Sequence, residues 1–390
     1  MKQNKRKICV VTSSRADYGL LAPLLKEIDS DNELELQLVV TGSHLSKRFG
    51  LTYKEIEKDG FKITKKIPIL EFNDTPEGIV KTMGLVSNKF AKAFKELSSD
   101  MVLVLGDRFE MLNVVSSALI FCIPVVHLNG GELTEGAFDD AIRHAMTKMS
   151  HIHLVATEEY RKRVLQMGEQ PKYVFNVGEV GLQNTITTKF LSKKELETDL
   201  KIKFNKKNLL VTYHPVTLES SNVSQQFNSL LKALDTCKDT TIIFTKCNAD
   251  TNGSIINKMI DNYTKTRRNV YSFVSLGQLR YLSLMSSVDA VVGNSSSGIV
   301  EAPSFKVATI NIGNRQKGRV QATSVINCEP CYVEIRRALD IVYSSSFKNK
   351  LKTVVNPYFK KNSPKLAKDI IKKISLNGII KKSFYNLGFK

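Results

Sequence analysis

Short, continuously apolar runs recur along the chain and alternate with segments of helical pattern. KICVVT at 7–12, MVLVLG at 101–106 and NLLVTY at 208–213 are three of these runs. A strand with one face in water alternates polar and apolar residues, whereas a continuous apolar run indicates a strand buried on both faces of a parallel sheet. Because such runs alternate with helical patterns from end to end, we predict an α/β protein built from doubly wound units.

The length of the chain and a break near residue 180 predict two domains. The chain has 390 residues, which is more than one hydrophobic core usually serves. In VFNVGEVGLQN (174–184) a strand ends and two Gly follow, and a charged stretch then precedes the next strand. We therefore predict two Rossmann-like domains, at 1–178 and 179–362, with a separate C-terminal segment at 363–390. Ligands of such sheets bind beyond the carboxyl ends of the strands, which predicts a site in the interdomain cleft.

The sequence carries no signal for a membrane or a metal partner. No apolar run approaches the roughly 18 residues of a membrane-spanning helix. The basic start is followed by only about five apolar residues and no cleavage site, so we expect a cytoplasmic protein without a signal peptide. Cys328 and Cys331 form a lone C-x-x-C without a second pair or a nearby His. A zinc site needs about four ligands, so no metal is expected.

The formal net charge of +19 does not by itself indicate a nucleic-acid partner. Residues 341–390 hold twelve Lys, no Arg and a single acid, Asp369, and so carry +11 of this charge. Base reading and bidentate phosphate contacts are typically made by Arg. We therefore interpret the tail as a solvated surface and expect no nucleic-acid binding.

Polar loops follow the expected strands of the first half. In TSSRADYG (12–19), Arg15 can meet an anion at a helix start, or it is a surface charge beside an N-cap formed by Ser14 or Asp17. TGSHLS (41–46) places His44 at a strand end. In GDRFE (106–110), Asp107 directly follows the apolar run and could also be only a helix cap. The richest segment is HLNGGELTEGAFDDAIRH (127–144), with two His and four carboxylates.

The second half repeats this arrangement. TYHPVT (212–217) places His214 on a loop, because the following Pro disfavours helix at that residue. GNSSSGIVEAP (293–303) offers Ser hydroxyls and backbone N–H groups at a helix start, which is a typical anion cradle. Glu301 lies about two turns along the expected helix, which is too far for capping. Because a carboxylate would repel a phosphate, we expect Glu301 to bind a neutral group such as the ribose hydroxyls. Neither a P-loop nor G-x-G-x-x-G is present. Six such loops in both halves indicate a diphosphate-bearing ligand surrounded by carboxylates and His.

An ordered set of motifs carries a family resemblance. The motifs are SRADYG, VTGSHL, LGDRFE, HLNGGE, FDDAIRHAMTKMSHIHL, YHPVT, NAD, GNSSSGIVEAPS and INIGNRQKGR, and they span about residues 8 to 320. The chain resembles the hydrolysing UDP-N-acetylglucosamine 2-epimerases of sialic acid synthesis and their relatives in legionaminic acid synthesis. The resemblance implies a GT-B arrangement of two Rossmann-like domains, with a final helix, NSPKLAKDIIKKI (362–374), returning to the N-terminal domain.

The resemblance implies a reaction as well. The family converts UDP-N-acetylglucosamine and water to N-acetylmannosamine and UDP through a 2-acetamidoglucal, without a redox cofactor, so no cofactor is expected. The implied partners are a nucleotide-sugar substrate and further copies of the same chain in a homo-oligomer. Four alternatives remain open: the same reaction on a UDP- or GDP-linked 2,4-diacetamido-trideoxyhexose, a non-hydrolysing epimerase, a GT-B glycosyltransferase, and a basic nucleic-acid binder.

Matching positions imply the site residues. The implied catalytic residues are Asp107, Glu132, Asp139, Arg143, His44 and His214. The implied nucleotide-sugar ligands are Arg15, Asp17, Arg108, Asn129, Asn248, Ser295, Ser296, Gly298, Glu301 and Arg315.

One position departs from the family pattern. Several members carry H-x-E-G-G-E, whereas this chain has Asn129 in place of the first Glu. An amide cannot act as a base, so Glu132 or Asp139 must do more, or the substrate differs. One branch of the family has His at this position, and a non-acid there is therefore compatible with activity.

Overall fold

The computed structural model describes residues 5–71, 75–135, 137–216, 222–247 and 253–388. The chain divides into two compact units. Unit 1 comprises Met1–Glu132, Asp139–Asn184 and Tyr358–Lys390, and unit 2 comprises Leu133–Phe138 and Thr185–Pro357. In the described segments, no helix is both long enough and apolar enough to cross a bilayer.

Unit 1 is built on a parallel sheet whose strands follow the order β3-β2-β1-β4-β5-β6-β7. Its strands are β1 (Arg6–Thr12), β2 (Leu34–Thr41), β3 (Ile63–Ile67), β4 (Met101–Leu105), β5 (Val125–Leu128), β6 (Ile152–Val155) and β7 (Val174–Asn176). Its helices are α1 (Arg15–Asp29), α2 (Tyr53–Lys58), α3 (Pro76–Leu97), α4 (Phe109–Ile120), α5 (Asp139–Met149), α6 (Glu158–Gln166) and α15 (Ser363–Lys373). Single 3₁₀ turns are η1 (Gly42–Leu45), η2 (Lys47–Phe49), η3 (Pro171–Tyr173) and η4 (Val180–Gln183).

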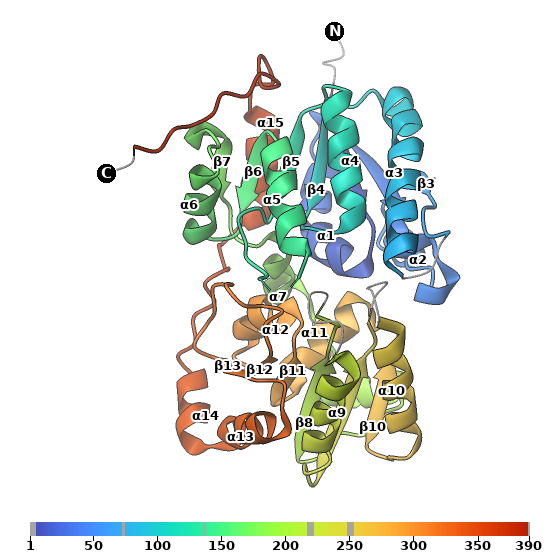
Figure 1. Cartoon of the computed structure of the whole chain (residues 1–390), viewed down its shortest axis with the longest axis vertical. Coiled ribbons are helices and arrows are strands. Elements are labelled where there is room, and N and C mark those ends of the chain that lie inside the picture. The colour runs from blue at the N-terminus through green and yellow to red at the C-terminus, as the bar shows by residue number, and fades with distance from the viewer. Residues whose placement is uncertain (1–4, 72–74, 136, 217–221, 248–252, 389–390) are drawn as a thin grey trace. The chain divides into compact units, whose positions relative to one another are not determined.

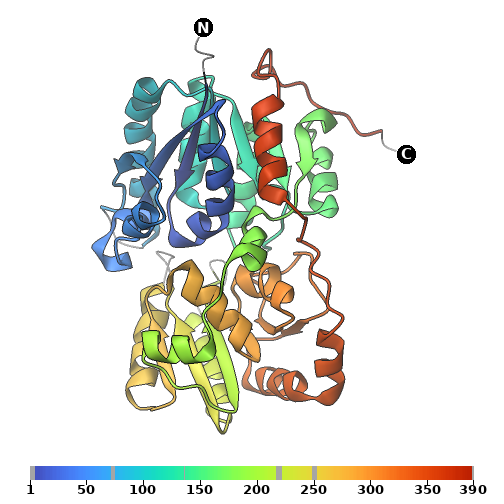
Figure 2. The ribbon, with the colours of Figure 1, turned by 180° about the vertical axis from the view of Figure 1, so that it is seen from behind.

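The continuous apolar runs of unit 1 are buried on both faces of the sheet, as the sequence predicts. In β1, Ile8 and Val10 belong to one core cluster, and Cys9 and Val11 belong to the other. The first cluster is covered by α1 and α15, and the second by α3 and α4 (Figure 1). Figure 2, seen from behind, shows α15 beside α1, although more than 300 residues separate them in the sequence.

The C-terminal segment is held to unit 1 by specific polar contacts. The Lys382 ammonium donates to the carbonyl oxygens of Lys148 and Ser150, at 2.8 and 2.5 Å, and to Glu169 Oε2 at 2.7 Å. Glu169 is buried and also bonds His153 Nε2 at 3.0 Å. This part of the tail is therefore an ordered contact and not only a solvated surface.

Unit 2 repeats the design with a parallel sheet in the order β10-β9-β8-β11-β12-β13. Its strands are β8 (Lys207–Thr212), β9 (Thr240–Thr245), β10 (Val270–Phe273), β11 (Ala290–Gly293), β12 (Ala308–Ile312) and β13 (Val325–Cys328). Its helices are α8 (Lys193–Leu200), α9 (Val223–Leu234), α10 (Gly253–Lys265), α11 (Gly277–Ser287), α12 (Ser296–Val300), α13 (Tyr332–Tyr343) and α14 (Ser345–Leu351), and η6 (Ala302–Phe305) follows α12. The short helix α7 (Asn184–Thr187) joins the units.

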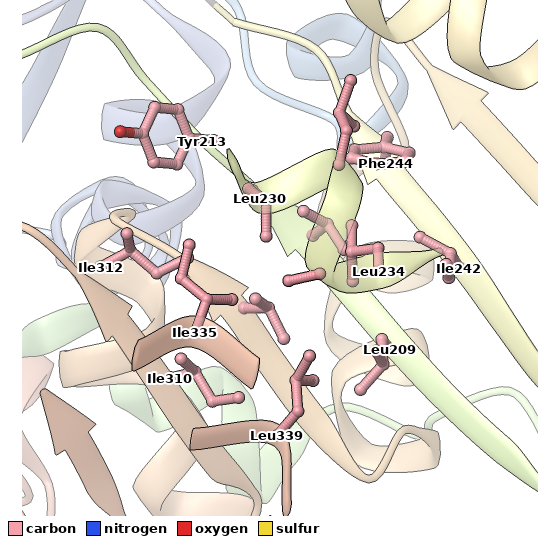
Figure 3. Close-up of a cluster of buried hydrophobic side chains, with 14 of the residues drawn as sticks. Leu209, Tyr213, Leu230, Leu234, Ile242, Phe244, Ile310, Ile312, Ile335 and Leu339 are labelled. Carbon is pink, nitrogen blue, oxygen red and sulfur yellow. The ribbon is translucent and has the colours of Figure 1, made fainter. Parts of the chain in front are cut away.

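Two clusters of side chains form the core of unit 2, one on each face of its sheet. Figure 3 shows the larger cluster, in which Leu230 of α9 and Ile335 of α13 pack over Leu209, Phe244 and Ile310 of the sheet. Helices α8 and α11 contribute to the cluster on the opposite face. The two faces of each sheet are thus covered, and the loops after the strands are left to carry chemistry.

Candidate active site

The carboxyl ends of four neighbouring strands of unit 1 bring the predicted residues of the first half to one sheet edge. These strands are β2, β1, β4 and β5, which are adjacent and parallel in the sheet. Their loops carry His44, Asp17, Asp107 and Asn129. The expectation that polar residues converge at this edge follows directly from parallel pairing.

Asp17 is the third residue of α1 and belongs to the capping box whose N-cap is Ser14. Its Oδ2 accepts from the backbone N–H of Ser13 at 2.8 Å, and its Oδ1 accepts from the Ser14 backbone and hydroxyl at 2.7 and 2.5 Å. The Ser14 hydroxyl oxygen in turn accepts a hydrogen bond from the Asp17 backbone N–H, which completes the capping box. Asp17 is buried, and of the two N-cap candidates that the sequence offered, the N-cap is Ser14. Arg15 is the first residue of α1 and lies in the turn that this box fixes.

His44 is a buried, neutral residue beneath the same turn. Its ring nitrogens lie 3.1 Å from Thr12 Oγ1 and 2.8 Å from Thr52 Oγ1. Burial and, to a lesser extent, the charge of Arg108 lower its pKa, against the opposing effect of Asp17. Because both ring nitrogens are engaged inside the protein, these contacts favour a role in shaping the loops over direct contact with a reacting group.

Arg143 connects three of the predicted catalytic segments. Its guanidinium is only 1% exposed and forms an ion pair with Asp107 Oδ2. It also donates to the carbonyl oxygen of Glu132 at 3.0 Å and lies 3.6 Å from Asp140 Oδ1. A planar guanidinium with several fixed donors suits this multiple role. The structure therefore places Asp107, Glu132 and the start of α5 around one buried cation, and Asp139 is the first residue of that helix.

Asp107 does not cap the helix that follows it. The N-cap of α4 is Arg108, which makes no side-chain cap. Arg108 instead pairs through Nε with the buried Glu110 at 2.6 Å. The carboxylate of Asp107 is thus available to Arg143 and remains about one quarter exposed.

His127 is a positioning residue that the sequence analysis did not single out. Its Nε2 lies 2.8 Å from the carbonyl oxygen of Gly106, and its Nδ1 lies 3.2 Å from Thr147 Oγ1. A carbonyl can only accept, so Nε2 carries the proton, and Nδ1 lies beside the Thr147 hydroxyl, which donates to the Arg143 carbonyl oxygen at 2.9 Å. Burial lowers the pKa of His127 to about 4 and keeps the ring neutral. His127 therefore ties the residue before Asp107 to the helix that carries Arg143.

Asn129 lies in the left-handed region, with φ of 63°, directly after β5. Its Nδ2 donates to Glu179 Oε2 at 2.6 Å, and both side chains are buried. The next turn needs glycine, because Gly131 has φ of 79° and a Cβ there would lie 2.6 Å from the Tyr160 carbonyl oxygen. Glu179 was not predicted, since it lies 50 residues away and only the fold brings it to Asn129.

A second unpredicted pair occupies the start of α5. His144 Nε2 lies 3.3 Å from Asp140 Oδ2, at i, i+4 spacing on one face of the helix. Burial lowers the pKa of His144, and Arg143 adds to this effect while Asp140 opposes it. The D-x-x-x-H spacing was the signal in the sequence that could have revealed this pair.

In unit 2, the loops after β8 and β11 interlock through Asn294. Its side-chain amide accepts from the His214 N–H at 2.7 Å and donates to the His214 carbonyl at 2.8 Å. Gly293 allows this approach, because its φ is 133° and a Cβ would lie only 2.0 Å from the Thr212 carbonyl oxygen. His214 is buried and is fixed to the serine loop by its backbone.

The serine loop of unit 2 opens a short helix, α12. Ser295 caps it by accepting from the Ser297 N–H at 3.4 Å. Gly298 lets the helix approach β12, because a Cβ there would lie 2.7 Å from Thr309 Cγ2. The predicted position of Glu301 two turns along a helix is wrong, since α12 ends at Val300 and Glu301 is its C-cap. The following Pro303 lies in η6, where the chain tightens.

Arg315, the last of the predicted cationic residues, also contacts the serine loop. Arg315 Nη1 donates to the Asn294 carbonyl oxygen at 3.0 Å, and Gln316 Nε2 donates to the same oxygen at 2.9 Å. Ser296, the first residue of α12, lies two residues after Asn294. Asn248 lies outside the described residues. Among the described residues, no three His, Cys, Asp or Glu side chains gather closely enough to hold a metal ion.

Comparison with known proteins identifies the family. The family model "UDP-N-acetylglucosamine 2-epimerase" matches residues 26–372. The chain belongs to this family. It is 49% identical over 386 residues to the "GDP/UDP-N,N'-diacetylbacillosamine 2-epimerase (hydrolyzing)" of Campylobacter jejuni, covering 98% of this chain and 100% of that protein. It is 39% identical over 375 residues to "Polysialic acid biosynthesis protein P7" of Escherichia coli, covering 94% and 95%.

A structural neighbour of the epimerase-family chain confirms its predicted fold class. This neighbour is the UDP-N-acetylglucosamine 2-epimerase of Neisseria meningitidis bound to UDP-GlcNAc, with a TM-score of 0.80 and 18% identity, covering 94% of this chain and 100% of that one. At this identity the likeness shows the fold, two Rossmann-like domains of the GT-B class. The predicted resemblance is confirmed by the family match.

Proposed function

We propose that this epimerase-family chain is a hydrolysing 2-epimerase of a nucleotide-linked 2,4-diacetamido-trideoxyhexose. The observation that carries the proposal is the 49% identity, from end to end, to a hydrolyzing 2-epimerase of N,N'-diacetylbacillosamine. A second relative with that activity in its name, from Legionella pneumophila, is 36% identical over 334 residues. The sequence alone favoured UDP-N-acetylglucosamine as donor and held the diacetamido sugar as its alternative.

UDP-N-acetylglucosamine remains the second candidate donor. A relative named UDP-N-acetylglucosamine 2-epimerase, from Neisseria meningitidis, is 34% identical over 325 residues and covers 83% of this chain. In that case the product would be N-acetylmannosamine, as in sialic acid synthesis. The two donors differ at C4 and C6 of the sugar, and no residue described above is assigned to those positions.

The proposed reaction begins with loss of the nucleoside diphosphate. The C1–O bond breaks, and positive character at C1 acidifies the otherwise inert proton on C2. A base removes this proton to give a 2-acetamidoglucal. Water then adds its oxygen to C1, and a proton returns to C2 from the opposite face. The products are the free epimerised sugar and the nucleoside diphosphate.

We assign the proton transfers to unit 1. Asp107, Glu132 and Asp139 are the candidate acids and bases, because Arg143 gathers their segments around one buried cation. Positioned carboxylates typically contribute about 10²- to 10⁴-fold to such steps. His44 is assigned a supporting role, since both its ring nitrogens are engaged with hydroxyl groups.

We assign nucleotide binding chiefly to unit 2. Ser295, Ser296 and His214 are proposed to hold the diphosphate, because Asn294 fixes their loops together. Arg315 would add positive charge there, and Glu301 would accept from the ribose hydroxyls. Arg15 and Arg108 of unit 1 are further candidate cations for the leaving group. A leaving diphosphate needs such fixed positive charge as its bond breaks.

The test is release of nucleoside diphosphate in deuterated water. The donors are UDP- and GDP-linked N,N'-diacetylbacillosamine and UDP-N-acetylglucosamine, with no acceptor added. We expect the diacetamido donors to react fastest and the free sugar to carry one deuterium at C2. Free sugar without deuterium would exclude the elimination. A product that keeps its nucleotide would identify a non-hydrolysing epimerase, and a need for an acceptor would identify a glycosyltransferase.

A further inference from the structure

The Asn129–Glu179 pair places a buried carboxylate against the side-chain amide of the residue that directly follows β5. Asn129 Nδ2 and Glu179 Oε2 are 2.6 Å apart, and the two side chains are 8% and 1% exposed. Asn129 follows β5 at the same sheet edge as Asp107. The pair therefore adjoins the segments to which the proposed chemistry is assigned.

Glu179 is itself held rigidly. Its Oε1 accepts from the Gly181 N–H at 3.2 Å, and its backbone N–H donates to the Tyr358 carbonyl at 2.9 Å. Since an ionised carboxylate only accepts hydrogen bonds, it selects one of the two orientations of the Asn129 amide. The Nδ2 group must face Glu179, and the amide oxygen is directed away from it.

We propose that Glu179 is a positioning residue that fixes the orientation of the Asn129 amide. Its carboxylate also disfavours a second negative charge at position 129. This inference rests on the proposed function for its kinetic consequences only. It means that Asn129 supplies a neutral, oriented amide at the sheet edge, with its oxygen as a hydrogen-bond acceptor for an N–H or O–H of the sugar. Because an amide cannot act as a base, the candidates for removal of the C2 proton remain Asp107, Glu132 and Asp139.

Glu179→Gln separates orientation from folding. Gln can still accept from the Gly181 N–H through its oxygen, which turns its Nε2 toward Asn129. Two facing donors repel, so the Asn129 amide must rotate and present Nδ2 where the native protein presents Oδ1. The hydrogen bond between residues 129 and 179 and the one to the Gly181 N–H are both kept, so we expect little change in the free energy of unfolding. We expect kcat/KM to fall about ten- to hundredfold, the range for a mispaired hydrogen bond to a buried group.

Asn129→Asp tests the exclusion of charge. Asp is tolerated in the left-handed region almost as well as Asn, so the backbone is preserved. Two carboxylates at this distance cannot both ionise, and the pair must retain a proton well above the usual pKa of either group. The folded state then binds a proton that the unfolded chain has lost, so stability falls as pH rises from 5 toward 8.

The double variant Asn129→Asp/Glu179→Gln restores complementarity. The amide introduced at position 179 can donate to the carboxylate introduced at position 129 and still accept from Gly181, and the pair carries one charge as in the native protein. We expect the pH dependence of stability seen in Asn129→Asp to disappear, while kcat/KM stays low because the charge now lies at position 129. Asn113→Asp is the matched control, since the Asn113 amide donates to a hydroxyl, that of Ser87, and not to a carboxylate.

The experiment combines urea unfolding of the four variants and the native chain from pH 5 to 8 with nucleoside diphosphate release across the same range. The proposal is overturned if Asn129→Asp keeps the native pH dependence of stability, or if Glu179→Gln keeps native kcat/KM. If no donor is turned over by the native chain, the proposed function fails, and the unfolding data still decide whether Glu179 excludes a charge from position 129.

Discussion

Replacing the buried His127 by Leu tests whether this residue links Asp107 to α5. The change keeps the side-chain volume nearly constant but removes the donor to the Gly106 carbonyl and the contact between His127 Nδ1 and the Thr147 hydroxyl. Leaving a buried carbonyl without its donor costs about 1–3 kcal/mol. At pH 7 we therefore expect the free energy of unfolding of His127→Leu to be about 2 kcal/mol lower than that of the native protein.

The same substitution should make stability less sensitive to acid. The pKa of His127 falls from its ordinary 6.5 to about 4 in the folded protein, mainly through burial. Between pH 6.5 and 4 the unfolded chain binds a proton at His127 that the folded protein does not bind. The free energy of unfolding of the native protein therefore falls by about 3 kcal/mol as the pH decreases over that range. Leu at this position cannot titrate. The difference between the two proteins should shrink on acidification and pass through zero at about pH 5.

The assay is urea unfolding between pH 4.5 and 7.5, together with nucleoside diphosphate release at pH 7.5. Buried His151 titrates in both proteins and so cancels from the difference. Because Gly106 precedes Asp107, we expect kcat to fall about tenfold or more while UDP binding is kept. Thr147→Val is the control, since it leaves the Gly106 contact intact. A stability difference that stays constant with pH would refute the neutral, buried assignment of His127.

Five further substitutions test the site and the fold. Asp107→Asn and Asp139→Asn should each lower turnover about a thousandfold while UDP binding, measured by calorimetry, persists. Glu132→Gln should abolish deuterium incorporation at C2 if Glu132 is the base, and retained incorporation would move that role to Asp139. Gly293→Ala should cost about 3 kcal/mol or more in urea unfolding, because its Cβ meets the backbone of β8. Lys382→Met should detach the tail and lower the unfolding free energy by about 1–3 kcal/mol, whereas the same change at the exposed Lys381 should have little effect.

The central strands of both sheets were predictable from the sequence, whereas three edge strands were not. Strands β1, β4 and β8 are buried throughout or nearly so, and their continuous apolar runs identify them. Strands β3, β10 and β13, by contrast, lie at sheet edges and mix polar with apolar residues over four or five positions. An edge strand is covered by fewer neighbours, so its sequence is under weaker pressure to be apolar.

The candidate site was predictable where its residues sit at strand ends and not where they depend on distant partners. Asp107 and Arg143 came from motifs, and their pairing follows once β4 and α5 are neighbours. Glu179 approaches Asn129 only through the folding of β6 and β7. No local pattern distinguishes a carboxylate that will meet an active-site amide from one that will meet solvent. His127 was hidden for the same reason, because its two partners lie on other elements.

The discontinuous path of the chain has a consequence for its synthesis. Unit 2 ends at Pro357, whereas unit 1 needs residues from Tyr358 onward. Ala367 and Ile371 of α15 cover a core that β1 and α1 began to form more than 300 residues earlier. During synthesis, unit 2 is therefore complete before α15 can cover the core cluster on one face of the unit 1 sheet. Unit 1 contains the first residues of the chain, yet its core can be completed only after all of unit 2 has been synthesised.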